Sequence, residues 1–123
     1  MTSDARLPII LLVEDDPLLS TTMRRYLERW SGDVRLAETC AQAVAAWRAM
    51  PAGVVMMDYR LPDGFGTDVI ARLRSDGRTD PVVCMTGEAE SIPPELQKSL
   101  DIRRVRGKPV MLVERVAAGQ GQC

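Results

Sequence analysis

Short apolar runs and longer amphipathic segments alternate along the whole chain. Runs of strand length, too short to form helices by themselves, occur at residues 7–13, 33–37, 54–57, 81–85 and 102–106. Between them, apolar residues recur three or four positions apart, which is typical of helices that pack on a core. The pattern predicts five strands that alternate with helices, without internal repeats or low-complexity linkers.

Local signals mark the first two helices. Asp16 is an N-cap residue, and Pro17 follows at the first helical position, where proline sacrifices no hydrogen bond. Ser31 and Gly32 are expected to end this helix, and Thr39 is expected to cap the next one. The apolar stripe of the first helix comprises Leu19, Met23, Tyr26, Leu27 and Trp30, and that of the second Val44, Trp47 and Met50.

The later helices are marked less clearly. After a loop that reaches about Gly66, a third helix is expected to carry Val69, Ile70 and Leu73 on its apolar face. Ser91 is the expected cap of a short fourth helix entered through Pro93 and Pro94. Residues 109–118 are expected to form a final helix.

The alternation indicates a parallel sheet covered by helices on both faces. The first, third and fourth apolar runs suit central strands, whereas the mixed second and fifth runs suit the edges. A chain of 123 residues has the usual size of one domain. We expect that domain to span residues 1–118, followed by a disordered tail at 119–123 that carries no packing signal.

Composition narrows the class of protein. Hydrophobic residues make up 46% and charged residues 27%, which is typical of a soluble globular domain. A net charge of −1 gives no global field for nucleic acid, and no apolar stretch approaches the roughly 18 residues of a membrane span. Three cysteines without metal-type spacing favour a reducing cytoplasm. With no histidine, histidine-based general base catalysis is excluded and a zinc site is disfavoured.

Chemistry-bearing residues follow four of the predicted strands. Glu14 and Asp15 end the first strand, Asp58 the third and Thr86 the fourth, while Lys108 comes just after the fifth. Ligands of such sheets bind beyond the carboxyl ends of the strands, so these residues should meet on one rim. Clustered carboxylates repel unless a hard cation such as Mg²⁺ lies between them. Acids, a cation, a hydroxyl and a lysine together suit phosphoryl transfer.

Four segments, "LLVEDDP", "MMDYRLPDGFG", "CMTGEAE" and "RGKP", occur in this order along the chain. In combination and spacing they resemble the receiver domain of bacterial two-component response regulators, over nearly the whole chain. The resemblance implies a flavodoxin-like, doubly wound (βα)5 sandwich whose five parallel strands stand in the order 2-1-3-4-5. It makes residues 1–118 a receiver domain.

The resemblance also implies roles for the site residues. Asp58 would accept a phosphoryl group from the phosphohistidine of a sensor histidine kinase or histidine phosphotransfer protein. Asp15 and Asp58 would bind Mg²⁺ (or Mn²⁺) directly, Glu14 would hold a metal-bound water, and the main-chain carbonyl of Arg60 would complete the protein ligands.

Thr86 and Lys108 would contact the phosphoryl oxygens. Asp16 falls outside the matched acidic pair and is left to cap its helix. The resemblance implies a phosphoacceptor regulatory domain, not an enzyme: it would catalyse only its own phosphorylation and dephosphorylation. Receivers tune the lifetime of the phosphoryl group at the positions occupied here by Arg60 and Glu88. Our hypothesis is that these two opposite charges pair across the mouth of the site and slow attack by water.

Several residues depart from the family pattern. Val105 stands where receivers commonly carry a Tyr or Phe that reports phosphorylation, and Arg106 and Gly107 replace the usual apolar residues before the lysine. The basic residues of the last strand are expected to protect a sheet edge, with a partner surface or homodimer as open alternatives. We expect the output surface to be nonstandard, with no direct binding to nucleic acid or membrane.

Other functions remain as alternatives. A receiver-like interaction module that is never phosphorylated is the main rival to a phosphoacceptor. A phosphohydrolase with an aspartyl nucleophile is disfavoured, because the position that should carry its second acid holds Arg60. A dinucleotide-binding domain is disfavoured because no glycine-rich loop follows the first strand.

Overall fold

Eleven elements make up the part of the chain that the structure, a computed structural model, describes, namely residues 9–29, 33–87 and 92–107. The strands are β1 (Ile10–Val13), β2 (Val34–Ala37), β3 (Val54–Asp58), β4 (Arg60–Leu61), β5 (Gly64–Phe65), β6 (Val82–Thr86) and β7 (Ile102–Gly107). The helices are α1 (Pro17–Leu27), α2 (Cys40–Ala49), α3 (Gly66–Ser75) and α4 (Pro94–Ser99). The expected helix at 109–118 and tail at 119–123 lie outside the described residues.

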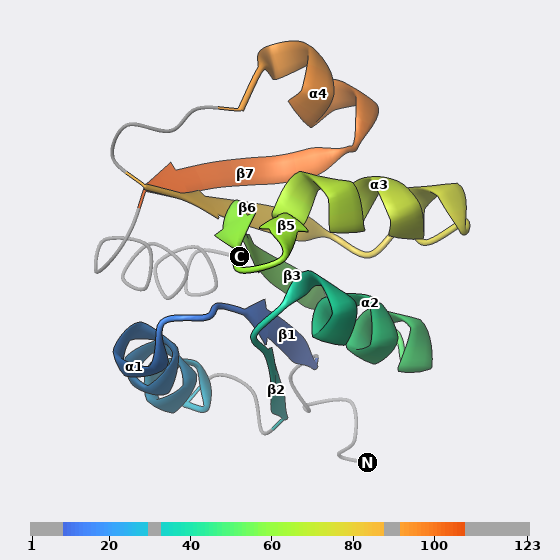
Figure 1. Cartoon of the computed structure of the whole chain (residues 1–123). Coiled ribbons are helices and arrows are strands. Elements are labelled where there is room, and N and C mark those ends of the chain that lie inside the picture. Colours follow the sequence, from blue (N-terminus) through green and yellow to red (C-terminus); the bar gives the residue numbers. More distant parts are fainter. Residues whose placement is uncertain (1–8, 30–32, 88–91, 108–123) are drawn as a thin grey trace.

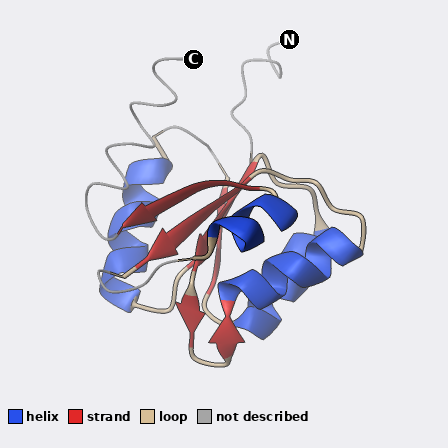
Figure 2. Cartoon of the chain, turned by 90° about the horizontal axis from the view of Figure 1, so that it is seen from above, coloured by secondary structure: helices blue, strands red, loops and turns tan. Residues whose placement is uncertain are grey.

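Five of the strands form one parallel sheet in the order β2-β1-β3-β6-β7. Because β4 and β5 form a separate two-stranded hairpin, this is the predicted 2-1-3-4-5 order, which is confirmed. The mixed strands β2 and β7 occupy the edges, as their composition predicted. Helices lie on both sides of the sheet, with α2 and α3 together on one face and α1 on the other (Figures 1 and 2).

Alternation along the central strands divides the core in two. Leu11 and Val13 of β1 pack with the helices α2 and α3, in a cluster that contains the fully buried Trp47. Ile10 and Leu12 of the same strand point to the opposite face and pack with α1. A strand buried on both faces is held rigidly, so its carboxyl end is a fixed point on which a site can be built.

The helix starts expected at Asp16 and Thr39 are confirmed. The carboxylate of Asp16 accepts hydrogen bonds from the N–H groups of Leu18 (2.9 Å) and Leu19 (3.2 Å). The hydroxyl of Thr39 accepts one from the N–H of Gln42 (3.0 Å). Each cap satisfies donors that the first turn of a helix leaves unpaired.

Two local expectations were wrong. The N-cap position of α4 is occupied by Pro93 and not by the expected Ser91, which lies outside the described residues, and Pro94 begins the helix. Pro94 restricts the preceding residue to an extended backbone, so the helix cannot start earlier. The segment after Asp58 is not a simple loop, since it contains the β4–β5 hairpin. No helix among the described residues is long and apolar enough to cross a membrane.

Candidate functional site

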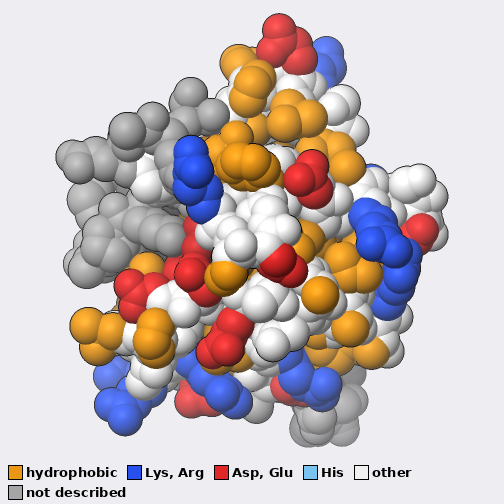
Figure 3. Space-filling model, viewed as in Figure 1, with side chains coloured by type: hydrophobic (Ala, Val, Ile, Leu, Met, Phe, Trp, Pro, Cys, Tyr) orange, Lys and Arg blue, Asp and Glu red, His pale blue; other side chains and the backbone are white. Residues whose placement is uncertain are grey.

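Three strand ends bring the predicted site residues to one edge of the sheet. Glu14 follows β1 directly, Asp58 is the last residue of β3, and Thr86 is the last of β6. Since β3 pairs with both β1 and β6, these ends are neighbours. Figure 3 shows several acidic side chains between the centre and the lower left of the face that it views.

The predicted acidic cluster forms. One carboxylate oxygen each from Glu14, Asp15 and Asp58 lie within 4.8 Å of one another. Glu14 and Asp58 are buried, with 0% and 2% of their surface exposed, whereas Asp15 faces solvent. Three hard oxygen donors, one of them open to water, fit the coordination that Mg²⁺ prefers, in which water completes the shell. Mn²⁺ takes the same donors.

Hydrogen bonds in the turn after β1 orient the side chain of Glu14 and direct that of Asp16 toward α1. The N–H of Asp16 donates to Oε2 of Glu14 at 3.0 Å, which orients the buried carboxylate. The side chain of Asp16 is engaged with the start of α1 instead. The prediction that Asp16 caps the helix and stays outside the acidic pair is therefore confirmed.

Two backbone hydrogen bonds of Tyr59, the residue after Asp58, fix the end of β3. The N–H of Tyr59 donates to the carbonyl of Met85 at 2.8 Å, which extends the pairing of β3 with β6 past Asp58. The N–H of Gly66 donates to the carbonyl of Tyr59 at 2.8 Å. Gly66 lies so close to the backbone of Asp58 that a Cβ atom there would overlap the Asp58 carbonyl oxygen.

Thr86 is buried, with 5% of its surface exposed, and pairs in register with Gly107 of β7. Lys108 follows Gly107 in the sequence but lies outside the described residues, as does Glu88. The expected contact of Lys108 with the site and the hypothetical pair between Arg60 and Glu88 therefore stay predictions.

Arg60 begins the β4–β5 hairpin, opposite Phe65. Its guanidinium carbon lies 5.5 Å from the centre of the Phe65 ring, a cation–π distance. The Phe65 ring also contacts that of Tyr59, with centroids 5.3 Å apart. Phe65 was not singled out from the sequence, because two-residue strands leave no periodic signal by which to pair their residues.

Asp63 fastens the hairpin to α2, and this role was also missed. Its carboxylate accepts hydrogen bonds from the N–H groups of Cys40 (2.7 Å) and Ala41 (3.2 Å). The hydrogen bond from Cys40 contributes most to the lowering of the Asp63 pKa. Asp63, which is 22 or 23 residues from these N–H groups in the chain, thus completes the cap that Thr39 begins. The only sequence signal for this role was the "PDG" turn.

Two cysteine thiols have raised pKa values. Burial, and then the charge of Asp58, raise the pKa of Cys84 to about 12. Burial, with a contribution from Asp63, raises the pKa of Cys40 to about 11. Because the thiolate is the nucleophilic form, a raised pKa disfavours both thiols as nucleophiles at neutral pH.

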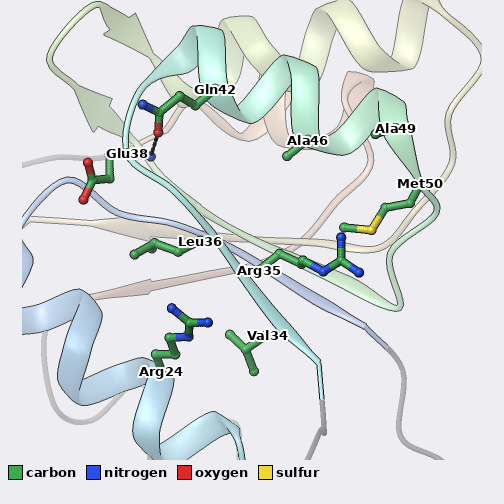
Figure 4. A pocket seen from close by; sticks show the side chains of 9 residues that line it. All are labelled: Arg24, Val34, Arg35, Leu36, Glu38, Gln42, Ala46, Ala49 and Met50. Atoms are coloured by element: carbon green, nitrogen blue, oxygen red, sulfur yellow. Dashed lines mark hydrogen bonds between the residues drawn. The ribbon is translucent and has the colours of Figure 1, made fainter.

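A separate groove of about 530 Å³ runs beside the edge strand β2, between α1 and α2 (Figure 4). Its floor is apolar and includes Leu36 and Met50, while Arg24 and Arg35 stand at its sides. Both arginines form ion pairs within the chain, with Glu28 and Asp33 respectively. None of the three clustered acids lines this groove, so it is distinct from the strand-end site.

Known proteins match this chain along most of its length. The model of the response regulator receiver domain matches residues 10–109. The photosynthetic apparatus regulatory protein RegA of Rhodovulum sulfidophilum is 34% identical over 80 residues, which cover 65% of this chain and 44% of RegA. The DNA-binding response regulator MtrA of Mycolicibacterium smegmatis is 31% identical over 83 residues, 68% of this chain and 36% of MtrA. The chain thus spans less than half the length of either relative.

Solved structures share the fold. A CheY-like response regulator receiver domain from Methanospirillum hungatei superposes with a TM-score of 0.79 at 22% identity, covering 94% of this chain and 95% of that one. The N-terminal domain of an uncharacterized protein from Wolinella succinogenes gives 0.80 at 19% identity, covering 92% and 90%. With its sheet order, its acid cluster and a family match over residues 10–109, this chain belongs to the receiver domain family of two-component response regulators.

Proposed function

We propose that this chain is a phosphoacceptor switch, in which Asp58 takes a phosphoryl group from the phosphohistidine of a histidine kinase or phosphotransfer protein. The observation that carries the proposal is the cluster of Glu14, Asp15 and Asp58, whose oxygens lie within 4.8 Å at the ends of adjacent strands. Membership of the receiver family supports phosphorelay signalling in general. The acceptor, the metal and the partner residues are our inference.

The transfer uses few groups. An oxygen of the Asp58 carboxylate attacks phosphorus, the bond from phosphorus to the donor's imidazole nitrogen breaks, and that nitrogen keeps the electron pair. The rigid end of β3 holds the nucleophile in place, and positioning supplies much of the catalysis in such reactions. The hydroxyl of Thr86 would donate to a phosphoryl oxygen, and the ammonium of Lys108 would pair with another.

A divalent cation fits the same site. Asp15, Asp58 and the carbonyl of Arg60 would hold Mg²⁺ or Mn²⁺, and Glu14 would hold one of its waters. The bound ion would offset the charge of the carboxylates and of the arriving phosphoryl group. Without such an ion, the phosphoryl group would meet three acidic side chains and little compensation.

Phosphorylation would act as a signal and not as turnover of a substrate. It adds about −1.5 to −2 charges beside Thr86. Thr86 and the chain after β6 would adjust to that charge and shift an existing equilibrium toward an active surface. We place this regulatory role in the cytoplasm, where free thiols such as Cys84 persist.

One observation favours the rival, an interaction module that is never phosphorylated. Val105 is half-buried and packs against the core cluster beneath α2 and α3. A valine held there cannot swing a ring between buried and exposed positions. If the switch is absent, the edge formed by β7 would still present a surface to a partner.

Intact-mass measurement discriminates the two functions. The wild-type protein is incubated with acetyl phosphate and Mg²⁺, and separately with a phosphorylated phosphotransfer protein. We expect the mass of one phosphoryl group to be added, and the Asp58→Asn variant to stay unmodified. Size-exclusion chromatography with beryllofluoride and Mg²⁺ tests for coupled assembly in the same samples. A wild-type mass that stays unchanged under both donors would exclude the phosphoacceptor and leave the interaction module.

A further inference from the structure

Two side chains of the β4–β5 hairpin, Arg60 and Phe65, form a small stack with Tyr59, the residue that follows Asp58. The Phe65 ring lies against Tyr59 at a centroid distance of 5.3 Å, with their planes tilted by 41°. The Arg60 guanidinium lies over the Phe65 ring at 5.5 Å. Phe65 is also 40% exposed. Among the described residues, Leu18 is the only other large apolar side chain that is exposed. The contact between the ring and the guanidinium therefore lies at the protein surface.

The hairpin that carries this stack is a fixed frame. Asp63 fastens its turn to the first two N–H groups of α2, and Leu61 is buried with 8% exposed. At its other end, Gly66 lies against the backbone of Asp58. Figure 1 shows the hairpin beside the end of β3, between the sheet and the start of α3. The Phe65 ring therefore has a set position relative to the acceptor.

Arg60 lies two residues after Asp58 in the chain. Two residues of chain span at most about 7 Å between Cα atoms. The Arg60 side chain is exposed, and its guanidinium lies over the Phe65 ring. The cross-strand register places Phe65 directly opposite it, and Tyr59 backs the ring. This arrangement limits where the guanidinium can go.

We propose that Phe65 is a positioning residue, which holds the Arg60 guanidinium at the rim of the Asp58 site and so prolongs the life of the aspartyl phosphate. The inference rests on the phosphoacceptor function proposed above and adds to it the device that sets the duration of the signal. It assigns the role to the aromatic ring, through Arg60, and not to the charge of Arg60 alone.

The step that Phe65 would slow is hydrolysis. A water oxygen bonds to phosphorus in line with the bond to the Asp58 oxygen, and that bond breaks with its electron pair left on the carboxylate. Both hydrogens of the water end on the released phosphate. The water needs a clear path along this line, and a guanidinium held across the rim restricts that path.

The proposal predicts a particular pattern of decay rates. Phosphorylated protein is freed of donor, kept in Mg²⁺, and followed by intact mass for Phe65→Leu, Phe65→Tyr, Arg60→Asn and the double variant Arg60→Asn/Phe65→Leu. We expect Phe65→Leu to shorten the lifetime about two- to fivefold, the change that corresponds to one exposed cation–π contact. Phe65→Tyr keeps the ring and should decay like the wild type. The double variant should decay no faster than Arg60→Asn alone.

Two results would overturn the inference. One is a Phe65→Leu protein that decays at the wild-type rate. The other is a Phe65→Leu effect that persists undiminished in the Arg60→Asn background, because the ring would then act on the hairpin and not through Arg60.

A readout without phosphorylation separates failure of this inference from failure of the proposed function. The Nε–H signal of Arg60 in an NMR spectrum should be shifted by the ring current of Phe65 and should move in Phe65→Leu but not in Phe65→Tyr. If it does not move, the positioning role is wrong. If it moves while the wild type takes no phosphoryl group, the ring positions Arg60 but the proposed function and its lifetime control are both excluded.

Discussion

Gly66 stands where α3 begins, directly against the backbone of the residue proposed to accept phosphate. Adding a Cβ atom at this position would bring it into overlap with the carbonyl oxygen of Asp58 and to 2.5 Å from Cγ of Met57. The side chain of Met57 can yield, but the carbonyl belongs to a buried strand that is paired on both sides. Closeness of the helix to the acceptor therefore requires glycine.

Replacing Gly66 by alanine should destabilise the protein by about 2–3 kcal/mol, because the overlap forces the helix or the strand to move. Urea unfolding, followed by the fluorescence of the buried Trp47, measures this loss. Phosphorylation by acetyl phosphate should slow as well, since the acceptor shifts with its backbone.

Gly77→Ala is the matched control for this substitution. Gly77 has a φ of +91°, so alanine there is strained, but its Cβ would meet nothing within 4 Å. We expect a loss of about 1 kcal/mol, from backbone strain alone. If Gly66→Ala costs no more than Gly77→Ala, the close approach to Asp58 is not what constrains the residue.

At the scale of elements, the end of the sheet opposite the site is held by an ion pair beneath β6. The Arg78 guanidinium donates to both oxygens of Asp80 at 3.0 and 2.9 Å, and to the carbonyls of Trp47 and Met50. Asp80 also accepts from the N–H of Ala52 at 2.8 Å. The pair thus ties the loop before β6 to the loop that joins α2 to β3.

Burial alone would raise the pKa of Asp80, but the hydrogen bonds from Ala52 and Arg78 outweigh it and lower the pKa to about 2. The pKa of an aspartate in the unfolded chain is about 3.9. A folded-state pKa below that value means that the group stabilises the fold above about pH 4 and loses this contribution as the pH falls toward 2. The contribution at neutral pH is about 2 kcal/mol.

Asp80→Asn should therefore lower the free energy of unfolding at pH 7 by about 2 kcal/mol. It should also flatten the dependence of stability on pH between 4 and 2, relative to the wild type. Urea titrations at several pH values measure both effects. Asp76→Asn is the control, because the ion pair of Asp76 with Arg48 is exposed and is expected to contribute less than about 1 kcal/mol. Equal pH slopes for wild type and Asp80→Asn would contradict the assignment.

Elements with a strong local signal could be predicted from the sequence, and those fixed by distant contacts could not. The central strands β1, β3 and β6 were visible because they are almost wholly buried, and α1 because Asp16 and Pro17 are residues that favour a helix start. The hairpin has strands of two residues, too short for any periodicity. Ser91 looked like a cap in isolation, but the two prolines after it decide where α4 begins.

The same distinction holds for the site. Glu14, Asp15 and Asp58 could be grouped in advance, because parallel strands place their carboxyl ends on one edge. The roles of Asp63 and Phe65 depend on how the hairpin folds back onto α2 and onto itself, and neither contact is encoded within a few residues. The grouping of the three acids could therefore be predicted from the sequence, whereas the contacts that hold the hairpin beside them could not.

At the scale of the whole molecule, the two ends of the sheet differ in electrostatic character. The amino ends of the strands carry the Arg78–Asp80 pair, in which a carboxylate is compensated. The carboxyl ends gather Glu14, Asp15 and Asp58, three acids within 4.8 Å, two of them buried. Like charges at this distance oppose folding. A cation bound between these three carboxylates would reduce the repulsion among them.

Mg²⁺ should accordingly stabilise the folded protein. A ligand that binds only the native state contributes about 2.7 kcal/mol at a hundredfold excess over its Kd, which corresponds to a rise in Tm on the order of 10 °C here. Asp15→Asn should differ from the wild type in two ways. It should have a higher Tm than the wild type without Mg²⁺, because it removes one of the three charges, and a much smaller response to added Mg²⁺. Thermal unfolding followed by circular dichroism over a series of Mg²⁺ concentrations measures both values.

Asp16→Asn controls for the loss of one negative charge next to the site. Asparagine keeps the cap of α1, and residue 16 lies outside the cluster, so this variant should retain the full response to Mg²⁺. A rise in Tm that is as large in Asp15→Asn as in the wild type would place the ion elsewhere. A wild-type Tm that Mg²⁺ leaves unchanged would mean that the three carboxylates do not form a metal site, and the charge at this end of the sheet would need another explanation.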